Sequence, residues 1–130
     1  MTAVIWKEQP DEHDYPAAAA YLSLLAPDAD VTHLVTALQK AAVVQQKAKD
    51  ILRAARLPLL PTDNPHVASD LEKVAKGKPL SPVLLVGGDL RTGRPVQIAD
   101  GYHRVCASYH IDENTDVPCR LVPPTAEPGR

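Results

Sequence analysis

Apolar side chains recur at helical spacing in the first third of the chain. Pro16 suits the first turn of a helix, and the run AAAAYLSLLA behind it is rich in helix formers until Pro27. Asp28 and Asp30 are candidate N-caps of a second helix, which we expect to reach about Lys47. The apolar face of this second helix repeats every three or four residues, at Val31, Leu34, Val35, Leu38 and Ala42.

The segment DILRAARLPLLPTDNP, residues 50–65, has no single period. Its leucines would suit a helix or a strand, but Pro58 and Pro61 prevent a continuous helix. The segment therefore predicts a short strand or a broken helix, followed by a loop. Asn64 then precedes Pro65 as an N-cap precedes a first helical residue, which predicts a helix from there to Gly77.

The second half of the chain alternates short apolar runs with turn residues. SPVLLVGG (81–88) and PVQIADG (95–101) flank DLRTGR, whose Thr92 and Gly93 favour a turn, so the two runs predict a hairpin. YHRVCASYHI (102–111) has helical period, and DVPCRLV (116–122) predicts a last strand. This order predicts an α+β fold: a small mixed sheet with covering helices, preceded by an N-terminal helical extension.

The 130 residues are enough for one packed domain. We expect a flexible arm at residues 1–14, the helical extension at 15–47, the sheet-bearing domain at 48–123 and a disordered, proline-rich tail at 124–130. Apolar residues make up 45% of the chain and Phe is absent, so the core has to be built from Leu, Val, Ile and Ala.

Composition narrows the class of partner. A net charge of -2 gives no overall basic field, so binding to nucleic acid is not expected and any anion site must be local. No stretch approaches the roughly 20 apolar residues of a membrane span, and no targeting pattern opens the chain, so we expect a cytoplasmic protein without membrane contact. Cys106 and Cys119 lack the spacing of a zinc site and predict two buried, reduced thiols.

The candidate chemistry lies in IADGYHRVCASY, residues 98–109, where a strand pattern gives way to a helical one. A helix start attracts anions, Gly101 leaves its backbone open to a ligand, and His103 and Arg104 add positive charge. Asp100 could bind a metal ion or act as a base. The alternative interpretation is that Asp100 caps the helix, Gly101 allows the turn, and both basic side chains point to solvent. Spacing alone favours neither.

Residues from about 50 to 122 resemble the ParB/sulfiredoxin-like superfamily. The resemblance is carried by PVLLV, IADGYHRVCASY and DVPCRLV, in that order. It implies a nucleotide-phosphate site at Gly101, Tyr102, His103 and Arg104 that takes ATP or CTP with Mg²⁺, with Asp100 and His103 as the catalytic candidates. It also implies that the segment before the helix at Pro65 approaches the nucleotide, which makes Asp63, Asn64 and His66 second candidates, although an N-cap with its neighbours explains them equally well.

Two roles known in this superfamily are not expected here. Tyr102 stands where sulfiredoxins carry their reactive cysteine, so repair of sulfinic acids is excluded. A DNA-partition role also fits badly, because the N-terminal helices lack a basic recognition face and eight residues follow Val122. We interpret the basic stretch QQKAKDILRAAR (45–56), with Lys47, Lys49, Arg53 and Arg56, as a solvated face; the alternative is that it lines the phosphate pocket.

Two classes of function remain as hypotheses. The first is a small ATP- or CTP-dependent phosphotransferase or hydrolase. The second is a nucleotide-sensing or protein-interaction module, in which the N-terminal helices contact a partner protein or form a homodimer, because Ala17–Ala20 with Leu22, Leu24 and Leu25 offer much apolar surface. A component of a toxin–antitoxin or defence system is a third hypothesis, which genomic context would decide.

Overall fold

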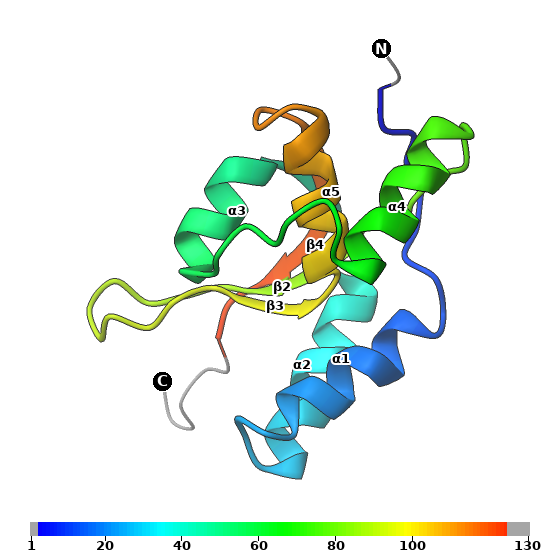
Figure 1. Ribbon diagram of the computed structural model, residues 1–130. Coiled ribbons are helices and arrows are strands. Elements are labelled where there is room, and N and C mark those ends of the chain that lie inside the picture. Colours follow the sequence, from blue (N-terminus) through cyan, green and yellow to red (C-terminus); the bar gives the residue numbers. More distant parts are fainter. Residues whose placement is uncertain (1–2, 125–130) are drawn as a thin grey trace.

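Four short strands form one mixed sheet at the centre of the computed structural model, which describes residues 3–124 (Figure 1). The strands are β1 (Val43–Lys47), β2 (Val83–Val86), β3 (Gln97–Asp100) and β4 (Asp116–Val122), in the order β1-β4-β2-β3. β4 pairs antiparallel with β1 and parallel with β2, and β2 pairs antiparallel with β3. The predicted α+β fold with a small mixed sheet is confirmed.

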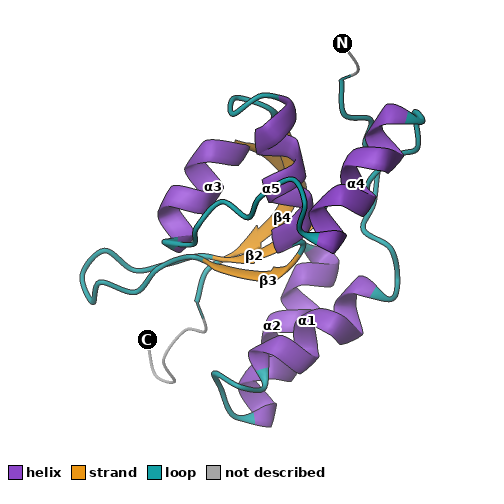
Figure 2. Ribbon diagram, in the orientation of Figure 1, coloured by secondary structure: helices purple, strands orange, loops and turns teal. Residues whose placement is uncertain are grey.

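Within residues 3–124, five helices lie on the two sides of this sheet (Figure 2). They are α1 (Asp14–Leu22), α2 (Asp28–Lys40), α3 (Ala48–Ala55), α4 (Pro65–Ala75) and α5 (Tyr102–Ile111).

The central strand β2 is buried on both faces, as its unbroken apolar run VLLV requires. Because side chains alternate along a strand, Val83 and Leu85 pack with α3, α4 and α5, whereas Leu84 and Val86 pack with α1 and α2. The sheet therefore separates two apolar clusters, and each cluster has its own covering helices.

The predicted second helix is too long. α2 ends at Lys40, Ala41 is extended with ψ 145, and residues 43–47 form the edge strand β1 instead. The β-branched pair Val43 and Val44 gains a full antiparallel register against β4, and this pairing overrides the local helical pattern. Arg120 of β4 closes the end of α2, because its Nη1 donates to the carbonyls of Leu38, at 3.1 Å, and Gln39.

The segment 50–65, predicted to be a short strand or a broken helix, begins with a helix. This is the short helix α3, whose C-cap residue Arg56 lies in the left-handed region (φ 57), and a loop then leads to Asn64. The predicted N-cap is confirmed, since Asn64 Oδ1 accepts from the backbone N–H groups of His66 (3.0 Å) and Val67 (3.2 Å). The predicted hairpin is also confirmed, with Asp89 and Arg94 exchanging backbone hydrogen bonds below its turn.

The N-terminal residues pack against the rest of the chain. The backbone of Leu80 donates to Ile5 and accepts from Lys7, both at 2.8 Å, so residues 5–7 of the expected flexible arm lie against the segment before β2. α1 and α2 cover one face of the sheet.

Apart from Pro124, the expected disordered tail lies outside the described residues. Within residues 3–124, no helix has the length and apolarity that crossing a bilayer requires.

The shared cluster predicts that α2 unfolds together with the sheet. Leu38 is fully buried, so Leu38→Ala should lower the free energy of unfolding by about 2–5 kcal/mol. Denaturation followed by circular dichroism should show a single transition at a lower denaturant concentration. The neighbouring exposed Gln39→Ala should stay within about 0.5 kcal/mol. A small effect of Leu38→Ala, or a separate transition for the helices, would contradict a common core.

Candidate functional site

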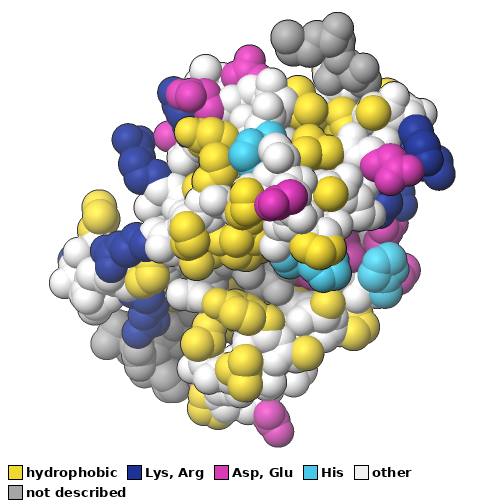
Figure 3. Space-filling model, viewed as in Figure 1, with side chains coloured by type: hydrophobic (Ala, Val, Ile, Leu, Met, Phe, Trp, Pro, Cys, Tyr) yellow, Lys and Arg dark blue, Asp and Glu magenta, His cyan; other side chains and the backbone are white. Residues whose placement is uncertain are grey.

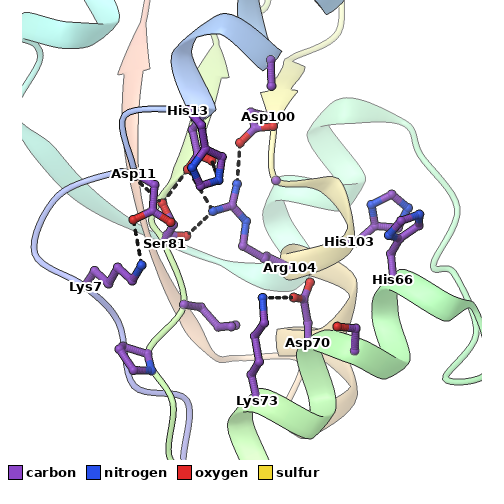
Figure 4. Close-up of a pocket in the computed structure, with 16 residues that line it drawn as sticks. Lys7, Asp11, His13, His66, Asp70, Lys73, Ser81, Asp100, His103 and Arg104 are labelled. Carbon is purple, nitrogen blue, oxygen red and sulfur yellow. Dashed lines mark hydrogen bonds and ion pairs between the residues drawn. The ribbon is translucent and has the colours of Figure 1, made fainter.

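A pocket of about 360 Å³ opens between the N-terminal segment, α4 and the start of α5 (Figure 4). Most of its wall is charged or titratable. It contains four carboxylates, three permanent cations and three imidazoles: Asp11, Asp14, Asp70, Asp100, Lys7, Lys73, Arg104, His13, His66 and His103. With neutral imidazoles the carboxylates outnumber the cations, so the pocket is not the simple cationic notch that residues 100–104 predict.

Gly101 makes the turn from β3 into α5, with φ 110. A Cβ at this position would lie 2.4 Å from Cγ1 of Val83 and 2.9 Å from Nη2 of Arg104. The left-handed backbone and the close approach of β2 therefore both require a glycine at this position. No side chain of the described residues caps α5, so the backbone N–H groups of its first turn have no side-chain acceptor there.

Arg104 is the centre of the polar network. Its Nη2 donates to Asp100 Oδ2 at 2.6 Å, and its Nη1 donates to Asp14 Oδ2 at 3.2 Å and to the carbonyl of Ser81 at 2.8 Å. The hydroxyl of Ser81 donates to the same Asp14 oxygen at 2.6 Å. The Arg104 side chain is only 13% exposed, and two carboxylates already bind its guanidinium. These contacts tie the N-terminal segment to β3 and α5, and binding of phosphate oxygens by Arg104 stays a prediction.

One guanidinium between two carboxylates leaves excess negative charge. Burial raises the pKa of Asp100 to about 6; Arg104 opposes this shift, and the charge of Asp14 adds to it. Asp100 is therefore ready to take up a proton near neutral pH, or to be neutralised by a cation.

Two imidazoles stand side by side at the opposite wall. The ring centroids of His66 on α4 and His103 on α5 are 4.7 Å apart, with the planes tilted by 44°. Burial, aided by His66, lowers the pKa of His103, and Asp70 opposes this shift. Burial also raises the pKa of Asp70, although Lys73 lies 3.9 Å from its carboxylate. A neutral His103 at neutral pH is a proton acceptor rather than a fixed positive charge.

A second group on the N-terminal side has the donors for a cation. Single ligand atoms of Asp11, His13 and Asp14 all lie within 4.8 Å of one another. Two carboxylates and one imidazole suit a divalent ion, and the imidazole favours Mn²⁺ over Mg²⁺. Asp11 also accepts from Lys7 at 2.7 Å, so an ion would compete with that pair.

The structure brings together five of the predicted site residues and leaves the others outside. Asp100, Gly101, His103, Arg104 and His66 line the pocket. The side-chain oxygen of Asn64 accepts the hydrogen bonds that cap α4. Tyr102 donates its hydroxyl to the carbonyl of Pro58 at 2.6 Å, which anchors the loop before α4. Asp63 is not part of the wall, and neither are Lys47, Lys49, Arg53 and Arg56 of the basic stretch.

Sequence reasoning missed most of the wall. Lys7, Asp11, His13 and Asp14 come from the segment interpreted as a flexible arm, and their local pattern carries no signal of a site. Asp70 and Lys73 could have been found, because they follow His66 at helical spacing on one face of α4.

Cys106 and Cys119 are buried as predicted. Burial raises the pKa of both thiols, and that of Cys119 rises to about 11.

Comparisons with protein-family models, with curated proteins and with solved structures found no match to this chain. What stands is a small α+β protein with a charged pocket beside the start of α5. The resemblance to the ParB/sulfiredoxin-like superfamily stays a prediction from the motifs.

Substituting Gly101 should separate packing from backbone strain. Gly101→Ala adds a Cβ that clashes with Val83 and also strains the left-handed backbone. We expect it to lower the free energy of unfolding by about 2–4 kcal/mol. Gly77→Ala is the matched control, because Gly77 has φ +70 but open space around its Cβ, and it should cost about 1 kcal/mol. Urea denaturation measures both variants. Equal losses in the two would contradict the close approach of Val83.

The raised pKa of Asp100 predicts a pH dependence with a definite sign. The folded state holds this proton more tightly than the unfolded chain, in which the pKa is near 3.8. The contribution of Asp100 to stability should therefore rise as the pH falls through 6 towards 4. Parent protein should gain stability relative to Asp100→Asn over this window, measured by denaturation at successive pH values with EDTA present. A difference that shrinks towards low pH would contradict the assignment.

Proposed function

We propose that the pocket beside the start of α5 binds the phosphate chain of a nucleotide, ATP or CTP, together with a divalent cation. The observation that carries the proposal is the division of the wall into two halves. His66, His103 and Lys73, with Asp70 beside Lys73, stand with the first turn of α5 on one side, and the carboxylates of Asp11, Asp14 and Asp100 lie on the other. Anion donors facing cation ligands across one hollow suit a metal-complexed polyphosphate.

The net charge of the pocket requires a divalent cation for nucleotide binding. A nucleotide alone would be repelled, because carboxylates outnumber permanent cations around the pocket. A divalent ion at Asp11, His13 and Asp14 would reverse that balance and favour an anionic guest. Mg²⁺ supplies charge neutralisation on phosphate oxygens, and Mn²⁺ would serve the same purpose with a better match to the imidazole.

The catalytic candidates take distinct roles in this proposal. His103, neutral at neutral pH, is suited to accept a proton from an attacking hydroxyl or water. Asp100 keeps Arg104 in place and carries a pKa near the working range, so it can hold a proton during the reaction. Arg104 acts as a positioning residue in this proposal, because its guanidinium already binds two carboxylates and one backbone carbonyl. Turnover as a phosphotransferase or hydrolase would show as release or transfer of phosphate.

Calorimetric titration with ATP and with CTP tests the proposed site. We expect binding in the presence of Mg²⁺ or Mn²⁺ and loss of binding in EDTA. Lys73→Ala should raise the dissociation constant about tenfold, the size of effect expected for a charge-assisted phosphate contact. Lys78→Ala is the control, since Lys78 is exposed and not part of the wall.

Two results would overturn the proposed function. One is absence of binding for both nucleotides with either metal ion. The other is an equal effect of Lys73→Ala and Lys78→Ala, which would place any binding elsewhere. Arg104→Ala is a poor test of the ligand, because it leaves two largely buried carboxylates without their partner and should destabilise the fold.

A specific observation also favours the interaction-module hypothesis. Leu24 is 82% exposed and Leu25 is 56% exposed in the turn between α1 and α2, although Leu22 is buried. The apolar surplus expected from the N-terminal helices is therefore concentrated at this turn. Nucleotide binding without phosphate release, together with association through this turn, would favour the module over the enzyme.

A further inference from the structure

The turn between α1 and α2 ends in an acidic, apolar surface. Leu24 and Leu25 project there, and Asp28 and Asp30 follow in the first turn of α2. No ion pair among the described residues involves either aspartate. We call these four residues the acidic end.

A basic, apolar surface lies between α3 and the hairpin of β2 and β3. Arg53, Arg56 and Arg94 line a hollow of about 380 Å³ together with Leu90, which is fully exposed. The hairpin is held against α3, because Val96 N–H donates to the carbonyl of Ala54 at 3.1 Å. Figure 3 shows Lys and Arg side chains gathered on the side of the molecule where α3 and the hairpin lie. We call Arg53, Arg56, Leu90 and Arg94 the basic end.

The two ends adjoin. Leu25 and Asp30 line a second hollow, of about 400 Å³, and Arg94 lines it too. Arg94 thus belongs to both hollows and joins the ends into one continuous surface. Within the described residues, Arg56 and Arg94 form no ion pair, and Arg53 has only an exposed partner, Asp50, at 3.2 Å.

We propose that this chain forms a two-fold symmetric dimer through this bipolar surface. A two-fold contact uses the same surface on both copies, so the surface must complement itself. When two copies meet in antiparallel orientation, the acidic end of each faces the basic end of the other, and opposite charges pair twice. Leu24 and Leu25 of one copy then cover Leu90 of the other, which removes the most exposed leucines from water.

The charge distribution favours a second copy over a polyanionic partner. A nucleic acid or an anionic bilayer would be attracted by Arg53, Arg56 and Arg94. It would be repelled by Asp30, which lines a hollow together with Arg94, and by Asp28 in the same helix turn as Asp30. A copy of the same chain satisfies both ends at once. The dimer surface shares no lining residue with the proposed nucleotide pocket, so the dimer does not depend on nucleotide binding.

Charge reversal tests the dimer. One chain carries Asp28→Lys with Asp30→Lys, and the other carries Arg53→Glu with Arg94→Glu. Each chain alone should repel its own copy, and its dimer dissociation constant should rise at least about tenfold over the parent. Mixed together, the two chains should form a one-to-one heterodimer, because opposite charges then meet at both contacts. Light scattering after gel filtration measures mass, and circular dichroism checks that the chains remain folded.

A matched pair of chains controls for general attraction between opposite charges. One carries Asp63→Lys with Glu72→Lys, and the other carries Lys76→Glu with Lys78→Glu, all at exposed positions on or beside α4. This mixture should not associate beyond the parent level. Association equal to that of the test pair would overturn the proposal.

Other outcomes would also overturn it. A parent chain that stays monomeric at high concentration has no such dimer. A parent dimer that neither reversal weakens uses another surface. If a chain shortened to Pro124 dimerises whereas the full chain does not, the last six residues compete for the surface, and the proposal fails for the full chain.

Discussion

The contact of Arg104 with Asp14, Ser81 and Asp100 is the interaction on which the rest of this structure depends. It joins the start of α1, the segment before β2, the end of β3 and the first turn of α5. Ion pairs that are largely withdrawn from water contribute little net stability, because desolvation offsets attraction, but breaking one is costly. Its main effect is therefore geometric: it fixes where the N-terminal segment crosses the sheet and so creates one side of the pocket.

The same contact sets the chemistry of the pocket. Because Arg104 serves two carboxylates, the surroundings of Asp100 stay negative, and burial raises the pKa of Asp100 to about 6. A site with this imbalance favours a proton or a metal ion before it favours an anion. The proposed binding of a metal-complexed nucleotide follows from that order, and it assigns the anion contacts to Lys73, His66 and the helix start rather than to Arg104.

The two covers of the sheet have different consequences at the surface. α3, α4 and α5 close one cluster, whereas α1 and α2 close the other and leave Leu24 and Leu25 exposed where they turn. The hairpin of β2 and β3 reaches beyond the sheet on the side of α3 and exposes Leu90 at its turn (Figure 1). The proposed nucleotide pocket and the proposed dimer surface thus lie on separate parts of the fold, so each can be altered without the other.

Local chemistry in the sequence determined much of the fold. The cap at Asn64, the hairpin around Thr92 and Gly93, the α5 pattern and the α+β class are each written within a few residues and appear as predicted. Local reasoning failed at residues 43–47, where the helical pattern continues but β4 supplies a strand partner far along the chain. The identity of β1 is therefore a tertiary decision.

The site divides in the same way. The sequence by itself determined that Asp100, Gly101, His103 and Arg104 gather at the start of a helix, because consecutive residues at a strand–helix junction cannot lie far apart. Only the tertiary structure decided what these side chains do, since Asp14 and Ser81 are 90 and 23 residues away from Arg104 and yet occupy its guanidinium. A charge shows its partner in a sequence only when that partner is a near neighbour. In this chain, the partner that sets the role of Arg104 arrives through folding.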